Sequence, residues 1–171
     1  GATDQGMVRK QNQDTFRFLE LGGDQFLAVV CDGMGGARAG NVASALAAQA
    51  FTEAIQHSDA QPEARLTAAL AQANEQVYQR AHQDPDCRGM GTTLVAALVE
   101  GNVAHIINVG DSRAYYLSQN GIRQITIDHS LVQDLLQRGH IPPEEARNHP
   151  NKNVITRALG VDSKLEGDLF T

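Results

Sequence analysis

Three aspartates lie at the ends of apolar segments, where a carboxylate at the edge of a sheet can meet a ligand. Asp32 follows the apolar run FLAVVC, Asp111 follows VAHIINVG, and Asp14 begins the first expected strand. Carboxylates that converge on one sheet edge form a hard-oxygen site of the kind that Mg²⁺ or Mn²⁺ prefers. Aspartate is also common in turns and caps, which is the simpler explanation for Asp14 taken alone. For Asp32 and Asp111 we expect a functional role.

Four glycines follow Asp32 within eight residues, at positions 33, 35, 36 and 40. Glycine weakens local structure, so this many glycines predict a close approach of the backbone to a ligand or to another backbone segment. A dinucleotide-binding loop is a second interpretation. It is disfavoured because the pattern G-x-G-x-x-G requires glycine where Arg38 stands.

Two further residues are candidates for such a site. Arg9 precedes Asp14 by five residues; a lone arginine is usually a solvated surface residue, but beside an anionic substrate it would clamp a phosphate with paired hydrogen bonds. His129 has the chemistry of a general base, although a histidine at the start of a helix is more often structural or exposed.

Hydrophobic periodicity predicts the elements that must position these residues. A hairpin turn at 22–24 separates the first two strands, Pro62 suits the first turn of a helix, and Gly139 ends another. We expect strands at 15–19, 26–31, 92–100, 103–110, 113–119 and 122–126, helices at 40–57, 62–83, 130–139 and 143–149, and a new strand entered within 164–171. This order indicates an α+β fold with antiparallel sheets.

Composition describes one acidic domain. The 171 residues are 42% hydrophobic, which is enough for one core, and the net charge of −6 argues against nonspecific nucleic-acid binding. No apolar run approaches the ~20 residues that span a bilayer, and no signal peptide is visible. Cys31 and Cys87 lie outside any metal-binding motif, so we expect both to be free and reduced in a cytoplasmic protein that binds no membrane.

Six segments stand together in an order and spacing that match one family. They are GATDQGMVRKQNQD, CDGMGG, GMGTTLVAALV, NVGDSRAYYL, DHSLVQDLLQRG and NVITRALG. The chain resembles the metal-dependent protein serine/threonine phosphatases of type 2C, bacterial branch, from Gly1 to about Gly160. Each segment alone is weak evidence, whereas six in order are highly specific.

The resemblance implies one catalytic domain over 1–171, built as a β-sandwich of two antiparallel sheets with a helical hairpin on each outer face. The two long helices would form one such hairpin, and residues 128–154 would form a flap beside the active site. Phosphorylated proteins would be the substrates, and a cognate serine/threonine kinase is an expected partner.

The resemblance also implies the chemistry. Asp32 would bridge two Mn²⁺ or Mg²⁺ ions, the Gly33 carbonyl would ligate one of them, and Asp111 would contribute to a third, weaker ion. A water between the two ions would attack phosphoserine or phosphothreonine directly. Arg9 would hold the phosphate, and Asp14 would hydrogen-bond a metal-bound water.

Some positions depart from the family pattern. Gln13 stands where glutamate is usual, so one metal loses a charged neighbour, and Met34 stands where many eukaryotic members have histidine. Asn41 replaces a frequent glutamate but still suits a helix N-cap. The later Ser-Asp-Gly and Asp-Asn motifs, which supply two metal-ligating aspartates in the family, do not occur in these 171 residues.

These departures leave two functions open. We expect a phosphatase whose sheets are incomplete at the C-terminus of this sequence, either because the sequence is a fragment or because the chain is naturally short, and which is inactive in this form. The alternative is a non-catalytic relative that binds phosphoproteins or other partners through an incomplete metal site. The enzyme is favoured because Arg9, Asp14, Asp32, Gly33 and Asp111 are kept together.

Overall fold

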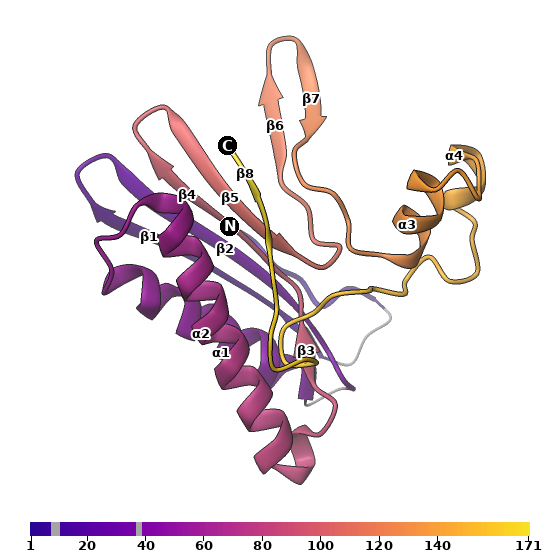
Figure 1. Cartoon of the computed structure of the whole chain (residues 1–171), viewed down its shortest axis with the longest axis horizontal. Coiled ribbons are helices and arrows are strands. Elements are labelled where there is room, and N and C mark those ends of the chain that lie inside the picture. The colour runs from indigo at the N-terminus through magenta and orange to yellow at the C-terminus, as the bar shows by residue number, and fades with distance from the viewer. Residues whose placement is uncertain (8–10, 37–38) are drawn as a thin grey trace.

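A six-stranded antiparallel sheet dominates the computed structural model, which describes residues 1–7, 11–36 and 39–171. Strands β1, β2, β4, β5 and β8 lie side by side in that order, and β3 pairs with the end of β2 (Figure 1). Their bounds are β1 Asp14–Gly22, β2 Gln25–Met34, β3 Gly91–Thr92, β4 Leu94–Glu100, β5 Val103–Val109 and β8 Asp168–Phe170. The expected strand within 164–171 is therefore confirmed, and it pairs with β5.

One face of this sheet is buried and the other is open. Along β2, Leu27, Val29 and Cys31 are fully buried, whereas Phe26 and Val30 are 36% and 43% exposed. The apolar run FLAVVC does not itself show this difference between the two faces. The difference arises because the described residues cover the sheet with helices on one side only (Figure 1).

The covering layer is a pair of long helices, α1 (Ala39–Gln56) and α2 (Pro62–Gln83), which end within one residue of the predicted positions. Small residues such as Ala43 and Ala47 on the buried stripe of α1 let the two helices and the sheet approach closely. From α2, Arg65 donates hydrogen bonds to the Ile55 carbonyl through Nε at 2.9 Å and Nη2 at 2.7 Å. This arginine satisfies an end carbonyl of α1 and joins the helices.

Four further elements lie apart from this body (Figure 1). They are the hairpin β6 (Tyr115–Ser118) and β7 (Gly121–Gln124) and the helices α3 (Leu131–Gln137) and α4 (Pro143–Ala146). The short 3₁₀ helix η1 (Pro85–Cys87) instead follows α2 and buries Cys87 in the core. Among the described residues the second sheet of the expected sandwich consists of β6 and β7 alone. The predicted helix at 143–149 is shorter than expected, ending at Ala146.

The 128–154 segment leaves and re-enters the body at one place. Leu131 donates its N–H to the Val154 carbonyl at 2.9 Å, and Thr156 donates to the His129 carbonyl at 2.8 Å. Ser130 and Ile155 form an isolated antiparallel bridge between these bonds. The two ends of the segment are thus tied to each other, while α3 packs chiefly against α4.

Cys31 and Cys87 are buried and neither is in a disulfide, as predicted. None of the helices formed by the described residues combines the length and apolar character that crossing a bilayer requires.

Candidate active site

Asp14 and Asp32 are direct partners in the antiparallel register of β1 and β2. Paired residues of adjacent strands project from the same face of a sheet, so the two side chains are neighbours. Asp14 is exposed and Asp32 is partly buried. The two-residue turn Gly23–Asp24 closes this hairpin, and the bulge between Glu20 and Gly22 shifts the register so that Asp14 rather than Thr15 lies opposite Asp32.

Asp32 and Asp111 line one cavity of about 470 Å³. Gly33 and Gln13 share its wall, whereas Asp14 does not line it. The structure therefore brings together Asp32, Gly33 and Asp111 as expected and places Asp14 beside them. Arg9, the predicted phosphate ligand, lies outside the described residues.

Gly33 is required by backbone packing. A Cβ on Gly33 would collide with the carbonyl of Gly40, and the Gly33 N–H donates to the Gln13 carbonyl at 3.0 Å. Gly40 is confined in turn, since a Cβ there would lie 2.6 Å from the side-chain nitrogen of Gln13. The prediction that these glycines permit a close approach of backbone to backbone is confirmed for this pair.

Thr93 connects Asp32 to the loop that carries Asp111. The Asp32 N–H donates to Thr93 Oγ1 at 2.9 Å, and Thr93 N–H donates to the Asp32 carbonyl at 2.9 Å. The same hydroxyl lies 2.7 Å from Ser112 Oγ, next to Asp111. Thr93 is 3% exposed, so this link is fixed within the core. Sequence reasoning missed this role, although two adjacent threonines before an apolar strand were a visible signal.

His129 fixes the turn before Asp111 from the other side. Gly110, with φ +101°, donates its N–H to His129 Nδ1 at 3.2 Å, and His129 donates its own N–H to the Gly110 carbonyl at 2.9 Å. Because Nδ1 accepts, the proton of a neutral ring lies on Nε2, which is 3.1 Å from Asp168. The imidazole is 5% exposed. His129 therefore has the structural role that its position favours.

Asp168 joins β8 to this network. It accepts hydrogen bonds from His129 and from Arg157 Nη1, the latter at 2.9 Å. Burial raises the pKa of the Asp168 carboxyl, but the hydrogen bonds from His129 and Arg157 outweigh burial and leave its pKa below the usual value.

The donor set at the cavity matches a hard divalent cation. Asp32 offers a carboxylate, Gly33 a carbonyl and Asp111 a second carboxylate on the same wall. Within the part of the chain that the structure describes, no three His, Cys, Asp or Glu side chains lie close enough to hold a metal by themselves. Mg²⁺ is commonly bound through one or two carboxylates and keeps several waters, so the residues present fit such an ion.

Known proteins resemble the chain along nearly its whole length. A family model described as "Protein phosphatase 2C" matches residues 7–134. The serine/threonine phosphatase stp of Listeria welshimeri is 44% identical over 173 residues, covering 98% of this chain and 69% of the relative. The crystal structure of serine/threonine phosphatase Stp1 from Staphylococcus aureus matches with a TM-score of 0.93 and 40% identity, over 99% of this chain and 68% of that one.

A third match is a solved structure that contains metal. It is the catalytic domain of the serine/threonine protein phosphatase PstP in complex with 2 manganese ions, with a TM-score of 0.82 and 37% identity over 98% of this chain and 68% of that one. The matched folds confirm the expected class, an antiparallel sheet structure flanked by helices.

Proposed function

This chain belongs to the protein phosphatase 2C family of serine/threonine phosphatases, and we propose that it hydrolyses phosphoserine and phosphothreonine in proteins at the cavity around Asp32. The observation that carries the proposal is the convergence of Asp32 and Asp111 on that cavity. Thr93 holds both strand ends in place through its hydroxyl, so the carboxylates are positioned before any ligand arrives.

Divalent cations belong to this proposal, with Mn²⁺ and Mg²⁺ both suited to the donor set. Asp32 and the Gly33 carbonyl would hold two ions, as the related PstP domain holds 2 manganese ions, and Asp111 would serve a third. Such ions supply charge neutralisation at the phosphoryl group and lower the pKa of the attacking water.

The side chains of the protein have separate roles in the reaction. Asp14, exposed beside Asp32, accepts a hydrogen bond from a water of the site and orients it. Arg9 would bind the phosphoryl oxygens with a planar, bidentate fork. Water attacks phosphorus, the bond from phosphorus to the side-chain oxygen breaks, and that oxygen takes a proton. Met34 lines the cavity and has no proton to give, so the proton comes from solvent.

On this proposal residues 1–171 form a catalytic domain of the family, and residues 128–154 are a flap over its substrate. Its substrates are phosphorylated proteins, among which a cognate serine/threonine kinase is a natural candidate, and it acts in the cytoplasm. The alternative, a phosphoprotein-binding relative without turnover, is favoured by the neutral Gln13 and by the lack of a three-acid cluster in the described residues.

Phosphate release from a phosphothreonine peptide, measured with and without Mn²⁺, separates the two functions. We expect Mn²⁺-dependent release by the whole protein, in which the later Ser-Asp-Gly and Asp-Asn motifs of the family pattern would be present, and none by its Asp32→Asn variant, which keeps the size of the side chain and removes its charge. Asp59→Asn, in the exposed loop between α1 and α2, is the matched control and should retain activity. Binding of the peptide without release in any metal would support the binding relative instead.

A further inference from the structure

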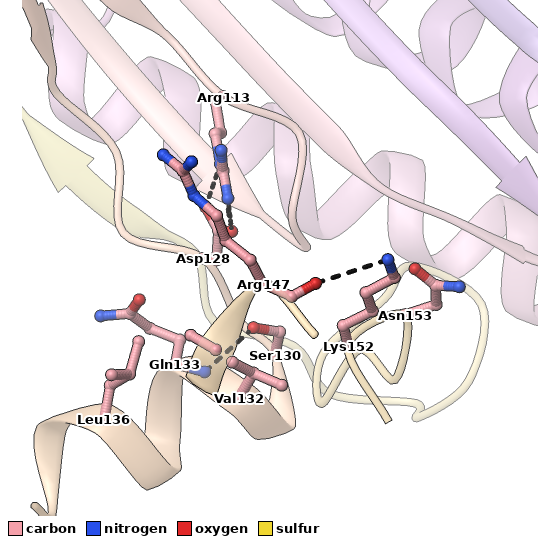
Figure 2. A pocket seen from close by; sticks show the side chains of 10 residues that line it. Arg113, Asp128, Ser130, Val132, Gln133, Leu136, Arg147, Lys152 and Asn153 are labelled. Carbon is pink, nitrogen blue, oxygen red and sulfur yellow. Dashed lines mark hydrogen bonds and ion pairs between the residues drawn. The ribbon is translucent and has the colours of Figure 1, made fainter. Parts of the chain in front are cut away.

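A second, smaller cavity lies next to the cavity around Asp32. It has a volume of about 270 Å³, and its charged lining residues are Arg113, Asp128, Arg147 and Lys152 (Figure 2). Asn153 lines both cavities. The two spaces therefore share part of a wall, so different residues of one bound polypeptide could occupy both.

The positive charge of Arg113 in this cavity is neutralised by the carboxylate of Asp128. Its Nε donates to Asp128 Oδ1 at 2.8 Å and its Nη2 to Oδ2 at 2.6 Å. The hydrogen bond to Asp128 raises the pKa of Arg113 above its usual value. The pair contributes little net charge and holds the guanidinium in one orientation.

Arg147 and Lys152 supply charge that is not balanced in the same way. No carboxylate of the described residues lies within ion-pair distance of either side chain. Lys152 Nζ donates to the Arg147 carbonyl at 3.5 Å, and the Arg147 side chain extends toward the Arg113–Asp128 pair (Figure 2). Glu144 and Glu145 precede Arg147 on α4, but neither lines the cavity. In a chain of net charge −6, this local excess of cations indicates an anion site.

The size and lining of the cavity indicate what kind of anion fits. Pockets for drug-sized molecules usually measure about 300–1,000 Å³, so about 270 Å³ suits one side chain better than a free metabolite. Val132 and Leu136 form an apolar part of the wall, while Gln133 and Asn153 add amide donors. An aliphatic stem with an anionic head matches this combination.

We propose that this cavity is a subsite for a second anionic side chain of the substrate, either a carboxylate or a second phosphoryl group, close in sequence to the phosphoresidue at Asp32. The inference rests on the proposed function, because it assigns both cavities to one polypeptide. Such a subsite makes the protein select phosphoproteins whose target residue lies among other anionic residues.

The test compares three fluorescent phosphothreonine peptides of equal length. One has neutral flanking residues, one has glutamates on both sides, and one carries a second phosphothreonine. Binding is measured by anisotropy without added metal, and turnover is measured with Mn²⁺ as the ratio of kcat/KM for each anionic peptide to that for the neutral peptide. Three proteins are compared: the unchanged protein, the double variant Arg147→Gln/Lys152→Gln, and the control variant Arg138→Gln. Arg138 is a cation of the same 128–154 segment, but it does not line the cavity.

We expect the protein to bind at least one anionic peptide more tightly than the neutral one, and the double variant to lose about fivefold of that preference. Arg138→Gln should keep it. A loss confined to the doubly phosphorylated peptide identifies a phosphoryl group as the ligand, and a loss with glutamates shows that a carboxylate suffices. An equal preference in the protein and the double variant, or an equal loss in Arg138→Gln, overturns the subsite. Failure of turnover on all peptides counts against the proposed function, while binding still decides the subsite.

Discussion

His129 and Gly110 are joined by two hydrogen bonds, one between backbone groups and one to the imidazole. The His129 N–H donates to the Gly110 carbonyl at 2.9 Å, and the Gly110 N–H donates to Nδ1 at 3.2 Å. Gly110 directly precedes Asp111, so the buried ring holds the backbone that carries this carboxylate. The ring is held in turn through Nε2 by Asp168.

Two substitutions of His129 separate these contacts. Asparagine places an amide oxygen near the position of Nδ1 and keeps the acceptor for Gly110, whereas glutamine reaches the position of Nε2 and keeps the donor to Asp168. We expect His129→Gln to raise the Mn²⁺ concentration for half-maximal activity by about 10-fold, because outer hydrogen-bond partners of metal sites commonly contribute 10- to 100-fold. His129→Asn should change it much less.

Both His129 variants should also lose thermal stability, because each leaves space in a buried site. Stability therefore does not distinguish a positioning role from a purely structural one, whereas the Mn²⁺ titration does. An unchanged Mn²⁺ dependence in His129→Gln would mean that the ring only supports the fold.

Gln13 offers a gain-of-charge experiment at the cavity wall. Its side-chain nitrogen donates to the Gly36 carbonyl, and Gln13→Glu replaces that donor with a carboxylate in addition to those of Asp32 and Asp111 at the cavity wall. We expect tighter Mn²⁺ binding in a calorimetric titration and a lower melting temperature without metal, since the carboxylate then faces a carbonyl. Weaker Mn²⁺ binding would mean that the bond to Gly36 matters more for the site than the added charge.

The packing of Gly33 against Gly40 predicts a large loss of stability for Gly33→Ala. The new Cβ overlaps a backbone carbonyl, and no side-chain rotation can relieve this clash. We therefore expect the free energy of unfolding, measured in urea, to fall by at least about 3 kcal/mol. Gly36→Ala is the comparison. Its φ is +85° but its Cβ would meet nothing within 4 Å, so only backbone strain of about 1–2 kcal/mol is expected. Equal losses would show that the Gly33 contact relaxes easily.

Cys31 makes stability depend on pH in the alkaline range. Burial raises the pKa of its thiol from 9.0 to about 12, so the unfolded chain releases this proton before the folded one does. The stability that the protonated Cys31 thiol contributes to the folded state is fully present below pH 9.0 and is lost as the pH rises toward 12. Between about pH 8 and pH 10 the protein should lose roughly 1.4 kcal/mol more than Cys31→Ala in urea unfolding. If the free energy of unfolding fell equally with pH in the protein and in Cys31→Ala, the Cys31 thiol would be accessible to water and its pKa would not be raised.

Local patterns were sufficient for the two long helices and the first hairpin. The boundaries of α2 follow from Pro62 and an apolar stripe, and the pairing of β1 with β2 follows from the short turn at Gly23–Asp24. Each depends on residues near one another in sequence, where propensity and period act directly.

Local patterns could not predict contacts between segments that are distant in the sequence. Thr93 reaches Asp32 across 61 positions and Ser112 across 19, and its use of hydroxyl and N–H here divides the expected strand 92–100 into β3 and β4. The period of an apolar run likewise does not say whether one or both faces of the sheet are covered, so the exposure of Val30 does not follow from the run FLAVVC.

The hydrogen bonds that join the two ends of the 128–154 segment keep the proposed substrate-recognition segment structurally separate from the strands of the proposed catalytic site. Because Leu131 meets Val154 where the chain leaves and rejoins the body, the excursion between them can change in length and sequence while the strands that carry Asp32 and Asp111 keep their places. On the proposed function, substitutions between these two positions would change substrate choice with little effect on the chemistry, apart from Asn153, which also lines the cavity around Asp32. Paralogues that diverged in this way would differ most between these two positions and least at the sheet edge.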